Sequence, residues 1–138
     1  MTNLTLSARA IFANDRYATE CTGVVIDLVE PGYARCSLDI LPQHRNAMGG
    51  VMGGVFFTLA DLAFAAAANT QPIQNGEQLA WVSLNSSIQY LAQPKGQRLT
   101  AETSCIKQGR TTCVYNILIR DEHNNLTAMV TTSGMSIN

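Results

Sequence analysis

The sequence predicts an α+β domain in which one long central helix is wrapped by a curved antiparallel sheet of about six strands. The helix is predicted because residues 55–69 are rich in Ala, Leu and Phe and contain neither Gly nor Pro. The sheet is predicted because the other segments alternate in polarity or are rich in Val, Ile and Thr. A chain of 138 residues is long enough for one domain, 1–138, and too short for two.

The elements are expected in a definite order along the chain. Residues 4–13 fit a short amphipathic helix, and residues 24–40 fit a hairpin that turns at Pro31-Gly32. Residues 42–54 hold one proline and four glycines, so they are expected to be irregular. The long helix follows, and Gln71-Pro72 is expected to close it off. Short connections predict antiparallel neighbours among the last four strands: 79–91, 98–107, 111–120 and 126–137.

The composition excludes several classes of partner and site. A net charge of −1 gives no basic excess for nucleic acid, and 46% hydrophobic residues are too many for a disordered chain. No apolar run is long enough for a membrane span, and residues 1–6 lack the features of a secretory signal, so a cytoplasmic location is expected. The four cysteines are interpreted as buried, reduced thiols. With only two histidines, a multi-histidine metal site is excluded. Since no GxGxxG or phosphate-binding lysine motif is present either, no cofactor is expected.

Asp61 is the first candidate for chemistry. It lies within the long helix among Leu, Ala and Phe, and no other charge lies between Arg45 and Glu77. A lone helical aspartate ordinarily faces solvent. This helix, however, is apolar on nearly every face and is therefore expected to be buried all round. A buried carboxylate must be paired or must reach water, so Asp61 is a candidate functional acid.

Gly53 and Gly54 come immediately before the predicted helix. The N-terminus of a helix offers unpaired N–H donors that can stabilise the developing oxyanion of a thioester or ester. Asn46 can donate to the same carbonyl, and Ser83 can orient a water molecule. The alternatives are a tight glycine loop, an asparagine bonded to its own backbone, and a serine on a polar strand face. His44 is by itself more often structural than catalytic.

The run H-x-N-x-x-G-x-x-M-G-G-x-x-x-x-L-A-D, from His44 to Asp61, resembles the signature of the hotdog-fold acyl-CoA thioesterases. The similar group is the PaaI-like enzymes of phenylacetate degradation and related human enzymes, within the 4-hydroxybenzoyl-CoA thioesterase superfamily. Ser83, followed seven residues later by Tyr90, also resembles the family's strand after the helix. The resemblance implies the hotdog fold and covers roughly residues 23–137.

The resemblance also implies a role for each matching residue. Asp61 would be the general base or the nucleophile, and Ser83 would support the water or the carboxylate. Gly53 would present its N–H to the thioester carbonyl, with help from Asn46. The family's site lies between two subunits, so a homodimer that assembles further to a homotetramer is expected. Where the family has a histidine, this chain has Met52, which puts rate and specificity in doubt rather than the reaction class.

The leading hypothesis is an acyl-CoA thioesterase that releases a free acid and CoA. The alternatives are a non-catalytic hotdog protein that binds acyl-CoA or a hydrophobic ligand, and a purely structural oligomer. Further residues are expected near the substrate: His44, Met52, Gly54 and Tyr90. Lys95, Lys107 and Arg110 are expected to cluster at two glycine-containing turns, where they hold CoA phosphates or are simply solvated.

Overall fold

A computed structural model of the chain describes residues 1–137. Two helical segments come first, α1 (Asn3–Phe12) and the π-helical turn η1 (Tyr17–Thr22), followed by the hairpin of β1 (Val25–Glu30) and β2 (Tyr33–Asp39). A 3₁₀ turn, η2 (Pro42–His44), leads through a loop to α2 (Gly53–Ala68) and the short α3 (Thr70–Asn75). The remaining strands are β3 (Trp81–Tyr90), β4 (Arg98–Gln108), β5 (Thr112–Asp121) and β6 (Leu126–Ser136).

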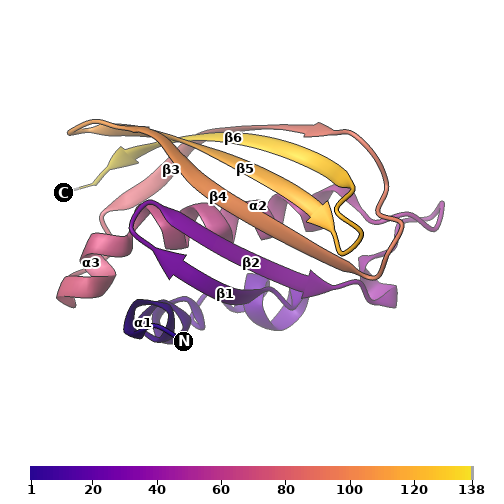
Figure 1. Cartoon of the computed structure of the whole chain (residues 1–138), viewed down its shortest axis with the longest axis horizontal. Helices are drawn as coiled ribbons and strands as arrows, with labels where there is room; N and C mark the ends of the chain where they lie inside the picture. The colour runs from indigo at the N-terminus through magenta and orange to yellow at the C-terminus, as the bar shows by residue number, and fades with distance from the viewer. Residues whose placement is uncertain (138) are drawn as a thin grey trace.

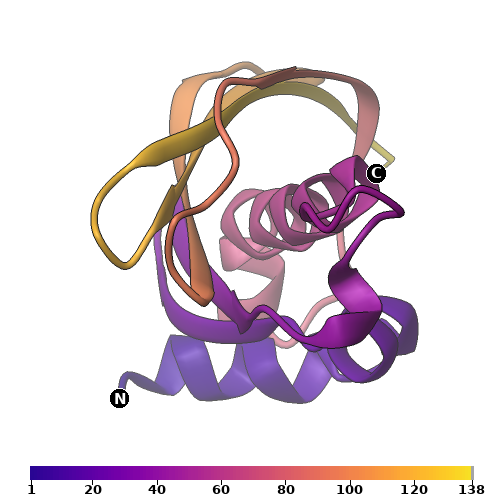
Figure 2. The same cartoon turned by 90° about the vertical axis from the view of Figure 1, so that its right-hand side faces the viewer.

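The six strands form one antiparallel sheet in the order β1-β2-β4-β5-β6-β3. The sheet arches over α2, and α1 lies below it beside β1 (Figures 1 and 2). The predicted architecture of a central helix wrapped by a curved sheet is therefore confirmed. One predicted pairing is wrong, because β3 and β4 are not neighbours. The loop after β3 carries the chain across the sheet, so β3 pairs with β6 and forms an edge.

Helix α2 begins at Gly53 rather than at Val55, so the two glycines lie inside its first turn and Met52 is the N-cap. The helix ends at Ala68, one residue before the predicted end at Asn69. The chain then forms α3, with Pro72 in its first turn instead of ending all helical structure. Asn69 makes this junction. Its side-chain oxygen accepts from the backbone N–H groups of Ala80, at 2.8 Å, and Trp81, at 2.9 Å. The C-terminus of α2 is thereby fixed to the start of β3.

The core lies between one side of α2 and the concave face of the sheet. Its largest fully buried side chains include Phe56, Leu59 and Phe64 of α2 and Leu99, Tyr115 and Ile117 of the sheet. The prediction that α2 is buried all round is wrong for the single chain. The sheet covers only part of the helix and leaves an open stripe of partly or largely exposed residues: Gly54, Phe57, Thr58, Asp61 and Ala65.

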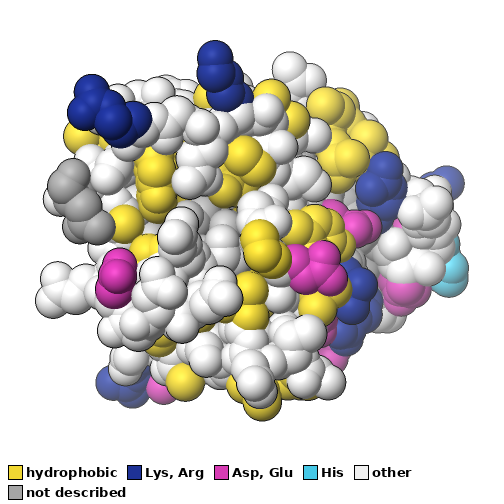
Figure 3. Space-filling view, turned by 60° about the vertical axis from the view of Figure 1, so that its left-hand side comes forward, with side chains coloured by type: hydrophobic (Ala, Val, Ile, Leu, Met, Phe, Trp, Pro, Cys, Tyr) yellow, Lys and Arg dark blue, Asp and Glu magenta, His cyan; other side chains and the backbone are white. Residues whose placement is uncertain are grey.

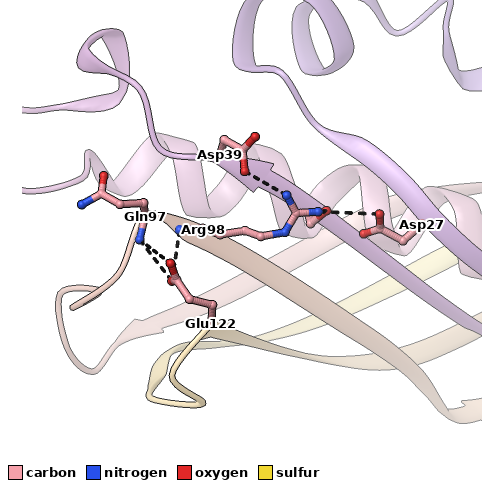
Figure 4. A network of polar contacts seen from close by, with 6 residues as sticks. Asp27, Asp39, Gln97, Arg98 and Glu122 are labelled. Carbon is pink, nitrogen blue, oxygen red and sulfur yellow. Dashed lines mark hydrogen bonds and ion pairs between the residues drawn. The ribbon is translucent and has the colours of Figure 1, made fainter.

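A polar clasp joins the hairpin of β1 and β2 to β4 and to the turn between β5 and β6 (Figure 4). The Arg98 guanidinium donates to Asp39 Oδ1 at 2.8 Å and to Ser37 Oγ at 2.7 Å. The Glu122 carboxylate accepts from the backbone N–H of Gln97 at 2.8 Å and from that of Arg98 at 3.2 Å. The Gln97 N–H is the main cause that holds the pKa of Glu122 below its ordinary value. The clasp fixes the end of the sheet at which α2 begins.

Apolar side chains are exposed along the edge strand β3 and its neighbour β6, among them Val82, Leu84, Met129 and Met135. The end of the molecule that carries the C-terminus likewise shows apolar side chains interspersed with few charged ones (Figure 3). Among residues 1–137 no helix is long and apolar enough to cross a membrane.

The interpretation of all four cysteines as buried is wrong for Cys21, which lies exposed on η1. Cys105 is half-buried, and Cys36 and Cys113 are buried.

Candidate active site

One half of the candidate site is the glycine end of α2. The backbone N–H groups of Gly53 and Gly54 have no acceptor among residues 1–137, as the geometry of a helix start requires. Tyr90 stands over this turn, and its hydroxyl donates to the carbonyl of Gly53 at 3.0 Å. Its ring packs edge-on against Phe56, with centroids 5.8 Å apart. The turn is therefore a rigid pair of free N–H donors held by an aromatic side chain from β3.

The loop before α2 is held by amide side chains. Asn46 Oδ1 accepts from the backbone N–H of Met48 at 2.9 Å and from that of Gly50 at 3.0 Å. Gln93, from the loop after β3, accepts from the Val51 N–H at 2.8 Å through its side-chain oxygen. Asn46 thus uses its oxygen to shape the loop, while its NH₂ group has no partner among residues 1–137 and stays available as a donor.

His44 links this loop to η1. The side chain is only 2% exposed, and both ring nitrogens are engaged. Nδ1 accepts from the Leu41 N–H at 2.9 Å, so Nε2 carries the proton and donates to the carbonyl of Thr22 at 2.7 Å. The backbone carbonyl of His44 in turn accepts from the N–H of Met52, which leaves the Met52 side chain half exposed beside Gly53. The arrangement gives His44 a structural task at the base of the loop.

The second half of the candidate site is the acid end of α2. Asp61 lies on the open stripe beside a cavity of about 500 Å³ and receives neither a hydrogen bond nor an ion pair from residues 1–137. Partial burial among apolar neighbours raises the pKa of its carboxyl group, and the negative charge of Asp15 raises it further. A carboxylate with a raised pKa is a stronger base than an ordinary aspartate.

Ser83 lies toward the acid end. It pairs with Gly134 of β6, and a side chain at Gly134 would collide with Phe64, which lies one turn of α2 beyond Asp61. The strand β3 therefore runs antiparallel to α2, with Ser83 near its acid end and Tyr90 at its glycine end. Each half of the candidate site accordingly combines α2 with β3: Gly53 and Gly54 with Tyr90 at one end, and Asp61 with Ser83 at the other.

The two halves do not meet within one chain. Asp61 follows Gly53 by eight residues, which corresponds to about 12 Å along a helix. A thioester needs its oxyanion donor and its base within about 3–3.5 Å of the reacting atoms. The predicted cluster of cations is also absent, because Lys95 precedes the eleven residues of β4 whereas Lys107 and Arg110 lie at its far end. Lys95 accordingly belongs to the glycine end and Arg110 to the opposite end of the sheet.

The sequence analysis did not identify three residues that hold the loop before α2 or line the cavity beside Asp61. Gln93 holds the loop before α2, and Asp15 and Tyr17 line the cavity beside Asp61. No motif marks them, because each reaches its place only through the packing of a distant segment. The sequence offered one indirect signal for Gln93, its position just after the strand that carries Tyr90.

Comparison with known proteins gives consistent results. The family described as the thioesterase superfamily matches residues 48–128. A putative esterase of Archaeoglobus fulgidus is 31% identical over 86% of this chain and 73% of its own length. The acyl-coenzyme A thioesterase PaaI of Escherichia coli is 32% identical over 89% of this chain and 84% of its own.

Among solved structures, the Escherichia coli PaaI protein of the phenylacetic acid degradation operon superposes with a TM-score of 0.85. Its sequence identity is 28%, and the alignment covers 99% of this chain and 97% of that one. The hotdog fold and the PaaI-like resemblance predicted from the sequence are therefore confirmed.

Proposed function

Because the chain belongs to the thioesterase superfamily, we propose that it is an acyl-CoA thioesterase, which hydrolyses an acyl- or aryl-acyl-CoA to the free acid and CoA. The observation that carries the proposal is the division of α2 into two complementary ends. The glycine end offers unpaired N–H donors, and the acid end offers an accessible carboxylate with a raised pKa. The relation to the Escherichia coli acyl-coenzyme A thioesterase indicates CoA thioesters as the substrate class.

In the proposed reaction the thioester carbonyl oxygen accepts from the Gly53 N–H, with the Asn46 NH₂ group as a second donor. Asp61 takes a proton from water while the water oxygen forms a bond to the carbonyl carbon, and Ser83 supports that water. The bond between carbon and sulfur then breaks, and CoA leaves as the thiolate, which takes up a proton. Direct attack by the Asp61 carboxylate, followed by hydrolysis of the anhydride, is the mechanistic alternative.

The reaction requires two copies of the chain, because the two ends lie about 12 Å apart on one helix. The free edge of β3 supports pairing with a second copy. Antiparallel pairing of two β3 edges needs a two-fold axis perpendicular to β3. Because α2 runs antiparallel to β3, that axis also reverses the helix and brings the glycine end of one α2 toward the acid end of the other. We propose such a homodimer, with further assembly to a homotetramer. The four cysteines, none of them in a disulfide, support a cytoplasmic location as part of the proposal.

The proposed contacts of Lys95, Lys107 and Arg110 with the CoA phosphates also depend on the dimer. The same two-fold axis brings the Lys95 end of one copy toward the Arg110 end of the other. We expect Arg110→Ala to raise KM for an acyl-CoA several-fold and to leave KM for the matching acyl-pantetheine nearly unchanged. Lys95→Ala provides the matched comparison from the other end of the sheet. An equal effect of Arg110→Ala on both substrates removes Arg110 from the binding surface.

The decisive experiment is a time-resolved assay of thiol release from a panel of acyl-CoAs of different chain length and aromatic content. The expected result is release of CoA by the wild-type protein and release at least about 10²-fold slower by Asp61→Asn. A rise in Tm with acyl-CoA but no thiol release would favour the non-catalytic binding protein instead. No rise in Tm and no release would leave a purely structural oligomer.

A further inference from the structure

The cavity beside Asp61 is built from two parts of the chain that are far apart in the sequence. One side is α2, which contributes Phe57, Thr58 and Asp61 of the open stripe and the buried Leu62 next to them. The other side is the segment 15–18, which follows the turn after α1 and contains the start of η1. The cavity measures about 500 Å³, within the range of about 300–1,000 Å³ typical of small-molecule sites.

The charged side chains of this cavity that have no partner are both negative. Asp15 and Asp61 both line it, and the side chain of neither receives a hydrogen bond or ion pair from residues 1–137. Arg16 also lines it, but its guanidinium is paired with Glu20, with a nitrogen–oxygen distance of 3.0 Å. The α2 helix has no other charged residue, and the Arg9 guanidinium of α1 is bonded to the carbonyl of Ile26 at 2.6 Å.

The rest of the lining is suited to an uncharged group. Tyr17, Ala18, Phe57 and Leu62 present apolar surface around the two carboxylates. An aliphatic or aromatic acyl group would bury this surface and gain from the hydrophobic effect. An acyl group that ends in a carboxylate would instead meet two like charges in a partly desolvated space, where repulsion is stronger than in bulk water.

We propose that Asp15 is a specificity-determining residue whose carboxylate, across the cavity from Asp61, excludes acyl groups that carry a negative charge. The inference rests on the proposed function, because it takes this cavity as the place of the acyl group. The proposal gives the segment before η1, which contains Asp15, a role in substrate selection. The raised pKa of Asp61, to which the charge of Asp15 contributes, agrees with the two carboxylates facing one space.

The test compares hexanoyl-CoA with adipyl-CoA, which have the same number of acyl carbons and differ by a terminal carboxylate. The wild-type protein is expected to give a higher kcat/KM for hexanoyl-CoA. Asp15→Asn is expected to raise kcat/KM for adipyl-CoA about tenfold while that for hexanoyl-CoA changes little, and Asp15→Glu should keep the wild-type ratio. Glu30→Gln is the control, since it removes one negative charge from an exposed residue outside the cavity.

Two further measurements separate this inference from the proposed function. In Asp15→Asn the acidic limb of the pH profile for hexanoyl-CoA should move to lower pH, because loss of a neighbouring negative charge lowers the pKa of Asp61. If the wild-type protein hydrolyses neither thioester, the proposed function fails. The dissociation constants of the two non-hydrolysable thioether analogues, measured by calorimetry, then still test charge selection. A wild-type preference for the adipyl compound, equal binding of both, or an unchanged ratio in Asp15→Asn overturns the inference.

Discussion

The two ends of α2 are built in opposite ways. At the glycine end, the Tyr90 hydroxyl donates to the backbone, and the side-chain oxygens of Asn46 and Gln93 accept from it. The proposed donors to substrate are the unpaired N–H groups of the helix itself. At the acid end, Asp61 has no partner and faces a cavity, and one half of the wall comes from a separate segment. The fold therefore fixes the proposed oxyanion donors within a single chain, whereas it leaves the Asp61 carboxylate open toward the proposed substrate and the proposed second copy.

The largest expected effect is at the acid end. Asp61→Asn should reduce kcat/KM about 10²–10⁴-fold, because it removes the proposed general base. Its Tm at neutral pH should be unchanged or slightly higher. The pKa of Asp61 is raised in the folded protein, so its ionisation at higher pH opposes folding, and the neutral amide lacks this penalty. Steady-state kinetics and thermal melts check both statements, and near-normal turnover would remove Asp61 from the mechanism.

The next effect tests whether the two ends meet across two copies. Leu84→Lys places a charge on the edge strand β3, at a side chain that is 57% exposed in the single chain. We expect light scattering to show dissociation toward a monomer of about 15 kDa. Specific activity should fall at least about tenfold in dilute protein and recover as the concentration rises.

Ile106→Lys is the control for the edge-strand variant, because Ile106 is 64% exposed but lies on β4, away from the free edge. It should leave assembly and activity as in the wild-type protein. Full activity in a monomeric Leu84→Lys protein would contradict the two-copy site.

The rigidity of the glycine end predicts a third effect. A Cβ atom added at Gly53 would lie 2.7 Å from the Tyr90 hydroxyl oxygen and 2.9 Å from Cζ, so Gly53→Ala must displace the ring or the helix start. We expect a loss of kcat of about 10²-fold, the magnitude of one misplaced oxyanion donor. At Gly54 an added Cβ would meet nothing within 4 Å, so Gly54→Ala is the matched control.

A double variant sharpens this prediction. Combining Gly53→Ala with Tyr90→Phe removes the hydroxyl oxygen that the new methyl group approaches most closely, and part of kcat should return relative to Gly53→Ala alone. Equal losses in Gly53→Ala and Gly54→Ala would show that steric contact with Tyr90 is not the cause.

The smallest effect concerns Met52, the N-cap of α2, whose side chain makes no capping hydrogen bond. Met52→His should raise kcat on a general acyl-CoA a few-fold with KM nearly unchanged, if an imidazole orders the turn better than a flexible thioether. A lower kcat with a shifted acyl preference would instead show that methionine widens the pocket for a particular acyl group. If neither kcat nor the acyl preference changes, Met52 has no role in catalysis or in substrate selection.

Local patterns predicted most of the fold and the main residues of the candidate site. The Ala-rich run identified α2 to within two residues at its start. Alternation identified the first two strands, and a high content of Thr, Val, Ile and Ser identified the other four. The motif from His44 to Asp61 selected the glycine turn, Asn46 and the one acid of the helix. The motif did not reveal that both ring nitrogens of His44 form hydrogen bonds with backbone groups. The Thr22 carbonyl in particular comes close to His44 only in the folded chain.

The first helix, the long helix and the six strands could be predicted from the sequence alone, because helix and strand preferences depend on neighbours a few residues away. The sequence also determined the chemical groups on offer: glycine N–H donors, the Asn46 amide and the Asp61 carboxylate. Only the tertiary structure decided that β3 lies at an edge, that α2 keeps an open stripe, and that Asp15 and Asp61 share one cavity. These arrangements depend on contacts between distant segments, set by how the sheet curves around the helix and leaves one side of it uncovered.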